Sequence, residues 1–166
     1  MTKENYIKMT QPFRENPGMA KGIHIINKLC TGIMYVSYPA LIVYLFLQKN
    51  ERLSCAVLVP AISFVLLSVG RYIINRPRPY EAFAVPPVIN KDTRGKSFPS
   101  RHVFSATIIA MTFLFASPWV WLGIVFLMVS VLLAVVRVVS GVHYISDVIA
   151  GIVIAVLAAW IGYIVI

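Results

Sequence analysis

Several basic and hydroxyl side chains in the middle of the chain are of the types that bind phosphate. Arg71, Arg78 and Arg137 carry planar guanidinium groups, which match the oxygens of a phosphate bidentately. Ser100 adds a hydroxyl donor at the start of an apolar run, where the free backbone N–H groups of a helix favour anions. If these residues meet at one point, they would form an anion site, most simply a phosphate site.

Two histidines and an aspartate could perform chemistry at such a site. His143 and Asp147 are four residues apart, so on a helix they would share one face. A carboxylate bonded to one ring nitrogen leaves the other as a base or nucleophile, and His102 could protonate a leaving oxygen. These side chains could instead ligate a metal, but neighbouring arginines disfavour a cation. We therefore expect no metal and no cofactor.

Each of these residues also has an ordinary structural explanation. His102 could be an interfacial polar residue, and the His143–Asp147 pair could be a structural hydrogen bond. Arg137 could extend to lipid headgroups. A functional site is favoured because all of them are expected to meet, so the elements that position them decide the interpretation.

Long uncharged stretches predict those elements. Hydrophobic residues make up 59% of the 166 residues, more than a soluble domain of this size can bury. Stretches of about 18 or more apolar residues indicate transmembrane helices. We expect an all-α integral membrane bundle with about five spans, at roughly 29–48, 54–73, 99–116, 119–138 and 147–166.

Span lengths predict that the polar residues converge. A helix rises about 1.5 Å per residue and the hydrocarbon core is about 30 Å thick, so each span crosses once. The second span ends near Arg71, the third begins near Ser100 and the fourth ends near Arg137. One membrane face should therefore hold all the candidates, which are Arg71, Arg78, Ser100, His102, Arg137, His143 and Asp147.

The N-terminal residues differ from the rest, and we expect residues 1–28 to form an amphipathic interfacial segment before a transmembrane domain at 29–166. The segment lacks the apolar core of a secretory signal peptide. From Pro17 onward its apolar residues would suit a helix in the membrane interface, and the alternative is an unstructured tail. Cys30 and Cys55 fall inside predicted spans, where we expect packing residues and not a disulfide.

Three pieces of the sequence resemble the signature of the type 2 phosphatidic acid phosphatase (PAP2) superfamily, the membrane branch related to vanadium haloperoxidases. In one-letter terms the signature is K-x6-R-P, then P-S-G-H, then S-R-x5-H-x3-D. This chain has Arg71-x6-Arg78-Pro79, then Pro99-Ser100-Arg101-His102, then Arg137-x5-His143-x3-Asp147. Order and internal spacing agree in all three pieces, over residues 71–147.

Three positions depart from the signature. Arg71 replaces lysine, which keeps the charge but changes the hydrogen-bond geometry. Arg101 replaces glycine and would be strained if the position required a positive φ; its side chain could join the phosphate pocket or point to the headgroups. Val136 replaces serine and removes one hydroxyl. No catalytic group is lost, so we expect activity.

The resemblance implies a metal-independent phosphatase of lipid phosphates or diphosphates, of the phosphatidic acid, phosphatidylglycerol phosphate or undecaprenyl diphosphate class. It implies that His143 is the nucleophile that forms a phosphohistidine, that Asp147 orients it and that His102 is the general acid. Phosphate binding would fall to Arg71, Arg78, Ser100, Arg101 and Arg137. The alternatives are a phosphotransferase with the same intermediate and a catalytically silent protein that binds anionic lipids.

The expected partners are a lipid phosphate and the bilayer, and not nucleic acid. The formal net charge is +9, and the positive-inside rule would place the basic face in the cytosol. The resemblance implies instead an extracytoplasmic site in a plasma membrane of the bacterial type. We favour the latter, because the loop cations are needed for phosphate. Family members usually have six spans, and the N-terminal segment would stand in for the first.

Overall fold

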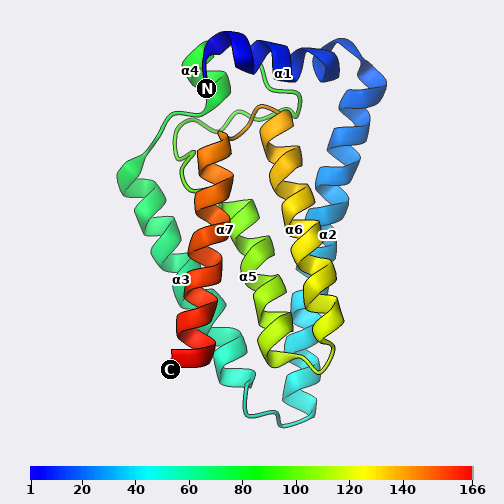
Figure 1. The fold of residues 1–166 in the computed structure, drawn as a ribbon, viewed down its shortest axis with the longest axis vertical. Helices are drawn as coiled ribbons and strands as arrows, with labels where there is room; N and C mark the ends of the chain where they lie inside the picture. The colour runs from blue at the N-terminus through cyan, green and yellow to red at the C-terminus, as the bar shows by residue number, and fades with distance from the viewer. Residues whose placement is uncertain (166) are drawn as a thin grey trace.

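The long helices run up and down the molecule, and a further helix lies across one end of them (Figure 1). The computed structural model describes residues 1–165, and these contain no strand. The elements are α1 (Lys3–Glu15), α2 (Pro17–Leu47), α3 (Leu53–Ile74), α4 (Pro79–Phe83), α5 (Arg101–Ala116), α6 (Val120–Val139), α7 (Ile145–Trp160) and a closing π-helix (Ile161–Val165). The predicted all-helical membrane bundle is confirmed.

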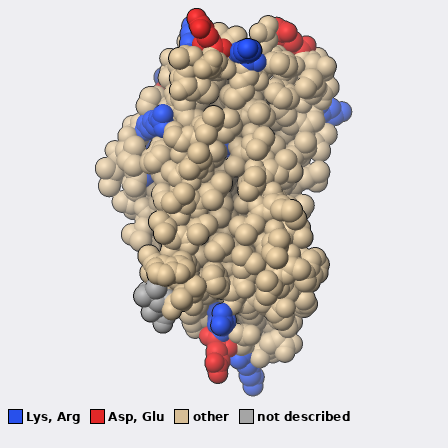
Figure 2. Space-filling view, in the orientation of Figure 1, with Lys and Arg blue, Asp and Glu red and all other residues tan. Residues whose placement is uncertain are grey.

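The outer helices have the length and composition needed to cross a membrane. Within residues 1–165 four segments qualify, and they correspond to α2, α3 with its extension to Phe83, α6, and α7 with the closing turn. Large apolar side chains point away from the bundle, and Val36, Leu66 and Ile73 are each at least two-thirds exposed. Charged side chains gather toward the two ends of the visible face and leave a largely uncharged belt between them (Figure 2). The protein is therefore an integral membrane protein.

Helix α5 forms the centre of the bundle. Eleven of its 16 residues are buried, and it packs against α2, α3, α6 and α7. Gly151 allows α7 to approach closely, because a Cβ there would lie 2.8 Å from the carbonyl oxygen of Ser100 and 3.3 Å from the amide nitrogen of Phe104. This contact holds the start of α5 directly against α7.

The start of α5 lies deeper in the bundle than the ends of α6 and α7 beside it (Figure 1). The segment that precedes it folds inward, and its residues Ser97, Pro99 and Ser100 are buried. We call this end, where α6 ends and α7 begins, the site end. With 16 residues, α5 is only about 24 Å long, shorter than a typical hydrocarbon core.

The N-terminal segment differs from the prediction. Residues 17–28 are the first turns of α2, so the expected boundary at residue 28 falls inside a continuous helix. The chain bends earlier, at Asn16, whose side-chain oxygen accepts hydrogen bonds from the amides of Gly18 and Met19 at 2.9 and 3.2 Å. Asparagine before proline is a strong helix start, which explains the bend. The helix that lies across the bundle is α1.

Helix α1 is tied to the site end through Tyr6. Its side chain is fully buried, and its hydroxyl donates to the carbonyl oxygens of Val85 and Gly141, at 3.3 Å each. Gly141 has a φ of 76°, which favours glycine, and it lies two residues before His143. The two cysteines are free, as expected.

Candidate active site

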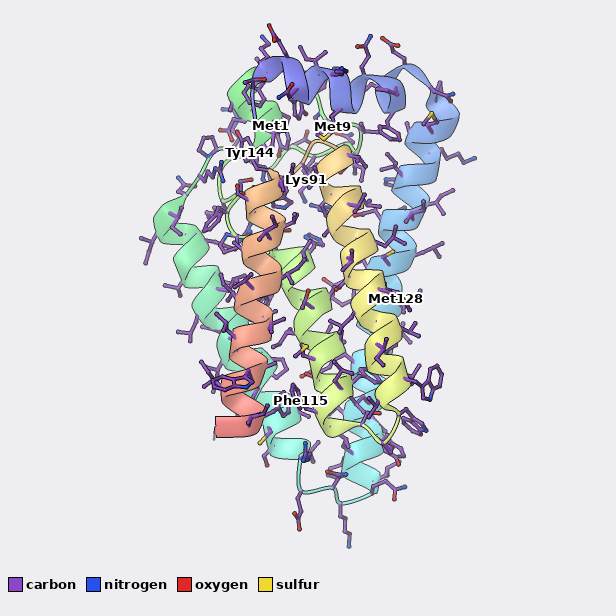
Figure 3. All side chains as sticks on the ribbon, in the orientation of Figure 1. Met1, Met9, Lys91, Phe115, Met128 and Tyr144 are labelled. Carbon is purple, nitrogen blue, oxygen red and sulfur yellow. The ribbon has the colours of Figure 1, made fainter. Side chains whose placement is uncertain are left out.

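A cavity of about 330 Å³ opens at the site end. Its lining contains five cationic side chains, two histidines and no carboxylate. Figure 3 places Lys91, one of these cations, at the same end of the bundle as Tyr144. The residues around the cavity are Ser68, Arg71, Tyr72, Arg78, Lys91, Thr93, Lys96, Arg101, His102 and His143. The cavity therefore brings together five of the predicted residues in strongly positive surroundings.

His143 and Asp147 meet, although not in the way that the spacing suggested. His143 lies before α7, and Asp147 is the third residue of that helix. Its carboxylate reaches back over the helix start, where Oδ2 accepts a hydrogen bond from the Tyr144 amide at 3.0 Å and lies 3.4 Å from His143 Nδ1. A proton on Nδ1 would serve this contact and leave Nε2 as the basic nitrogen.

The imidazole of His143 is held in its neutral form. The residue is 1% exposed. Burial lowers its pKa from 6.5 to about 4, more than the hydrogen bond with Asp147 raises it, and the nearby Arg137 and Arg78 lower it further. At neutral pH the ring is therefore uncharged, as a nitrogen nucleophile must be.

Two residues that the sequence did not single out complete the surroundings of Asp147. The hydroxyl of Ser97 donates to Oδ2 at 2.5 Å, and Nη1 of Arg76 donates to Oδ1 at 2.8 Å. The Arg76 guanidinium also lies 4.1 Å from the centre of the Tyr144 ring. These contacts fix the carboxylate that touches His143. Within residues 1–165, no three His, Cys, Asp or Glu side chains are grouped as metal ligands.

Arg71 and Arg78 combine a charge at the cavity with contacts to the backbone. The Arg71 guanidinium donates to the carbonyl oxygens of Lys96 and Pro99, and Arg78 donates through Nε to the carbonyl oxygen of Gly95 at 3.1 Å. Both side chains are buried. These two arginines therefore hold the inward-folded segment in place, in addition to any contact with a ligand.

Arg137 and Ser100 are buried polar groups with unmet hydrogen-bonding capacity. Arg137 is 3% exposed and donates through Nη1 to Oδ1 of Asn27 at 3.2 Å. Among the described residues, its Nε and Nη2 have no partner, and neither has the hydroxyl of Ser100. Buried donors without partners are costly, and a bound anion would satisfy them, although neither residue is among those that line the cavity. Asn27 was not predicted, because it belongs to the N-terminal part of α2.

The start of α5 bears on two predictions, that free backbone N–H groups there bind an anion and that Arg101 could be strained. The Ser100 amide donates to the carbonyl oxygen of Asp147 at 2.8 Å, so this N–H is not available to an anion. Arg101 is the first residue of α5 and is not among the residues with positive φ. The arginine is thus accommodated without backbone strain.

A second cavity, of about 220 Å³, adjoins the first and is mainly apolar. Arg101 and His102 line both cavities. The other residues of the second cavity come from α2, α3, α5 and α6, and they are Thr31, Met34, Tyr35, Phe64, Ser105, Ala106, Ile109 and Leu133. A molecule with an anionic head and an apolar tail would match this pair of cavities.

Comparisons with known proteins agree with this arrangement. The family model described as PAP2 superfamily matches residues 52–166. An undecaprenyl-diphosphatase of Sulfolobus acidocaldarius is 30% identical over 135 residues, which cover 80% of this chain and 63% of that protein. The bacitracin transport permease protein BcrC of Bacillus licheniformis is 30% identical over 142 residues, covering 81% of this chain and 67% of that protein. The match thus spans less than two thirds of the first relative.

Two solved structures share the fold. LpxE of Aquifex aeolicus superposes with a TM-score of 0.73 at 23% identity, covering 96% of this chain and 92% of that one. A PAP2 type phosphatidylglycerolphosphate phosphatase of Bacillus subtilis gives the same TM-score at 20% identity, covering 96% and 83%. Both coverages extend beyond the segment that the family model matches, so the similarity of fold includes N-terminal helices.

Proposed function

The chain belongs to the PAP2 superfamily, and on that premise we propose that it is a membrane-embedded phosphatase that hydrolyses a lipid phosphate or diphosphate without a metal. The names of its relatives support this class of substrate, since they include an undecaprenyl-diphosphatase and a phosphatidylglycerolphosphate phosphatase. Phosphatidic acid, phosphatidylglycerol phosphate and undecaprenyl diphosphate are the candidates to test.

The proposed first step transfers the phosphoryl group to His143. Its Nε2 attacks the phosphorus while the bond from phosphorus to the leaving oxygen breaks. His102 gives its proton to that oxygen, and the negative charge of the bound substrate favours the protonated form of His102 needed for this step. The imidazole ring gains positive character, which the adjacent Asp147 carboxylate stabilises. Arg78 and Arg137 neutralise charge on the equatorial oxygens of the phosphoryl group.

The proposed second step returns the enzyme to its starting state. His102, now without its proton, takes a proton from a water molecule that attacks the phosphohistidine. The bond from phosphorus to Nε2 breaks, and inorganic phosphate leaves. If a lipid or sugar hydroxyl replaced the water, the same intermediate would make the enzyme a phosphotransferase.

One observation favours this proposal over a role in lipid binding alone. A neutral, carboxylate-bonded histidine faces the same cavity as Arg71, Arg78 and Arg101, and within residues 1–165 Nε and Nη2 of Arg137 and the hydroxyl of Ser100 have no partner. Binding of an anionic headgroup needs the cations alone. The contact of His143 with Asp147 adds an oriented nucleophile, which headgroup binding alone does not require.

Phosphate release from the candidate lipids, by the purified full chain in detergent with a chelator present, tests the proposal. His143→Gln should lower the rate by about a thousandfold or more. His24→Gln is the matched control, because His24 is exposed on α2. Full activity of the His143→Gln variant would refute the mechanism. If all of the transferred phosphate appears as free inorganic phosphate when candidate acceptors are present, the enzyme is not a phosphotransferase.

We place the site on the extracytoplasmic side, in line with the family resemblance and against the count of basic residues. The loop cations line the cavity and are explained by phosphate, so they do not report on orientation. Labelling of single cysteines at residues 85–92 by an impermeant reagent on intact cells tests this. Protection of every such cysteine until the cells are lysed would overturn the placement.

A further inference from the structure

We propose that Arg101 binds the second phosphate of a lipid diphosphate, the one next to the tail, and so makes diphosphates the preferred substrates. This inference rests on the proposed function and narrows its substrate class. The residue stands where the family signature has glycine, so the signature itself assigns no role to its side chain.

The position of Arg101 matches the place of that second phosphate. The residue lines both the positive cavity and the apolar cavity, together with His102. In a lipid diphosphate, the phosphate next to the tail lies between the terminal phosphate and the apolar chain. If the terminal phosphate occupies the positive cavity and the tail the apolar one, the second phosphate falls at their junction, beside Arg101.

The charge around the positive cavity exceeds what one phosphate requires. Arg71 and Arg78 line the cavity together with His143, yet Lys91, Lys96 and Arg101 line it as well. Burial and the neighbouring Arg137, Arg78 and Arg101 lower the pKa of Lys91, as expected where cations gather without an anion. A diphosphate adds the negative charge that would balance them.

Arg101 itself is free to take part. Its side chain is exposed, and neither ion pair within residues 1–165 involves it. Its guanidinium lies 5.8 Å from the centre of the Phe64 ring, which also lines the apolar cavity. The side chain therefore rests at the mouth of the tail cavity, where a guanidinium fork can meet two phosphate oxygens.

The same contact would assist the reaction of a diphosphate. As the bond from His143 Nε2 to the terminal phosphorus forms, the bond from that phosphorus to the bridging oxygen breaks. The electron pair goes to the bridging oxygen, which takes the proton of His102, and the departing lipid monophosphate keeps the negative charge of its other oxygens. Arg101 would stabilise this charge. Water then releases the terminal phosphate, and the products are one inorganic phosphate and one lipid monophosphate.

Farnesyl diphosphate and farnesyl monophosphate test the inference, because they differ by one phosphate and share a tail. We expect wild-type kcat/KM to be higher for the diphosphate. Arg101→Gly should lower the ratio of diphosphate to monophosphate kcat/KM by about tenfold or more, and Arg101→Lys should restore part of it, because it keeps the charge without the fork. Arg94→Ala, a change at an exposed loop arginine outside both cavities, should leave the ratio unaltered.

The outcomes separate the inference from the function on which it rests. If the wild type hydrolyses both lipids and Arg101→Gly leaves the ratio within about twofold, the inference is overturned and the phosphatase stands. An equal loss on both lipids would likewise overturn it, since it would indicate general anchoring at headgroups. If the wild type hydrolyses neither these lipids nor the candidate phospholipids, the proposed function falls as well.

Discussion

Asn27 offers a sharp test of how this site is held, because it lies outside the segment that the family model matches. Its side-chain oxygen accepts the hydrogen bond from Arg137 Nη1 at 3.2 Å, and within residues 1–165 no other side chain is bonded to that guanidinium. We predict that Asn27→Ala will leave Arg137 buried but poorly oriented. Phosphoryl transfer should slow without loss of the fold.

The size of the effect follows from the type of bond. A hydrogen bond to a charged group contributes about 1.5–3 kcal/mol, and each 1.4 kcal/mol corresponds to about a tenfold change in rate. Since Arg137 is almost fully buried, solvent cannot replace the lost partner. Asn27→Ala should therefore lower kcat/KM for lipid hydrolysis by about 10- to 150-fold.

The assay is phosphate release, measured together with thermal unfolding of the protein in detergent. Lys28→Ala is the control, because Lys28 is the exposed neighbour on the same helix. In a double-mutant cycle, Asn27→Ala should add little to Arg137→Ala, since both changes remove the same interaction. Activity of Asn27→Ala within twofold of wild type, with Arg137→Ala severely impaired, would refute the reasoning. So would full additivity of the two changes.

Three further predictions concern the catalytic pair and its support. Ser97→Ala removes the hydroxyl that donates to the buried Asp147 carboxylate, and it should lower kcat by about 10-fold or more while a Ser97→Thr variant retains more activity. The acid limb of the pH profile of kcat/KM should lie near 4, and not near 6.5, because burial lowers the pKa of His143 and only its neutral form attacks the phosphorus. An acid limb near 6.5 that is the same for two substrates whose phosphates differ in pKa would contradict this. Gly151→Ala would push a methyl group against the backbone at the start of α5, and it should reduce stability by about 1–3 kcal/mol in thermal or denaturant unfolding, whereas Gly32→Ala, with open space around it, should not.

The sequence predicted the helical framework well, because uncharged stretches of membrane length leave few alternatives. It did not predict where the first long helix begins. Lys21 and Lys28 interrupt the apolar pattern, yet α2 continues through both from Pro17. A helix can extend beyond the hydrocarbon when its polar residues are exposed, and Lys21 and Lys28 both are. Hydropathy marks the part of a helix inside the membrane rather than the whole helix.

The motifs singled out five residues that line the cavity, but they did not point to Ser97, Asn27 or Arg76, which contact the candidate site residues. Spacing identified His143 and Asp147, but it suggested a shared helix face, whereas the aspartate folds back over a helix start. Ser97 and Asn27 carry no charge and belong to no motif, so only the folded chain shows what they touch. Arg76 lies two residues before Arg78, and its contact with Asp147 joins residues that are far apart in the sequence, so only the folded chain shows it.

The recessed start of α5 affects the free energy needed to bring a lipid from the bilayer into the site. Lifting a phospholipid out of its leaflet exposes its chains to water, at about 0.8 kcal/mol for each methylene group. Because α5 is short and the segment before it folds inward, the start of α5, whose Arg101 and His102 line the cationic cavity, is recessed below the ends of α6 and α7 beside it. The substrate could then slide sideways from the leaflet into the bundle, with its tail still in hydrocarbon. The enzyme would avoid an extraction penalty that grows with every carbon of the chain, and long tails would be no harder to process than short ones.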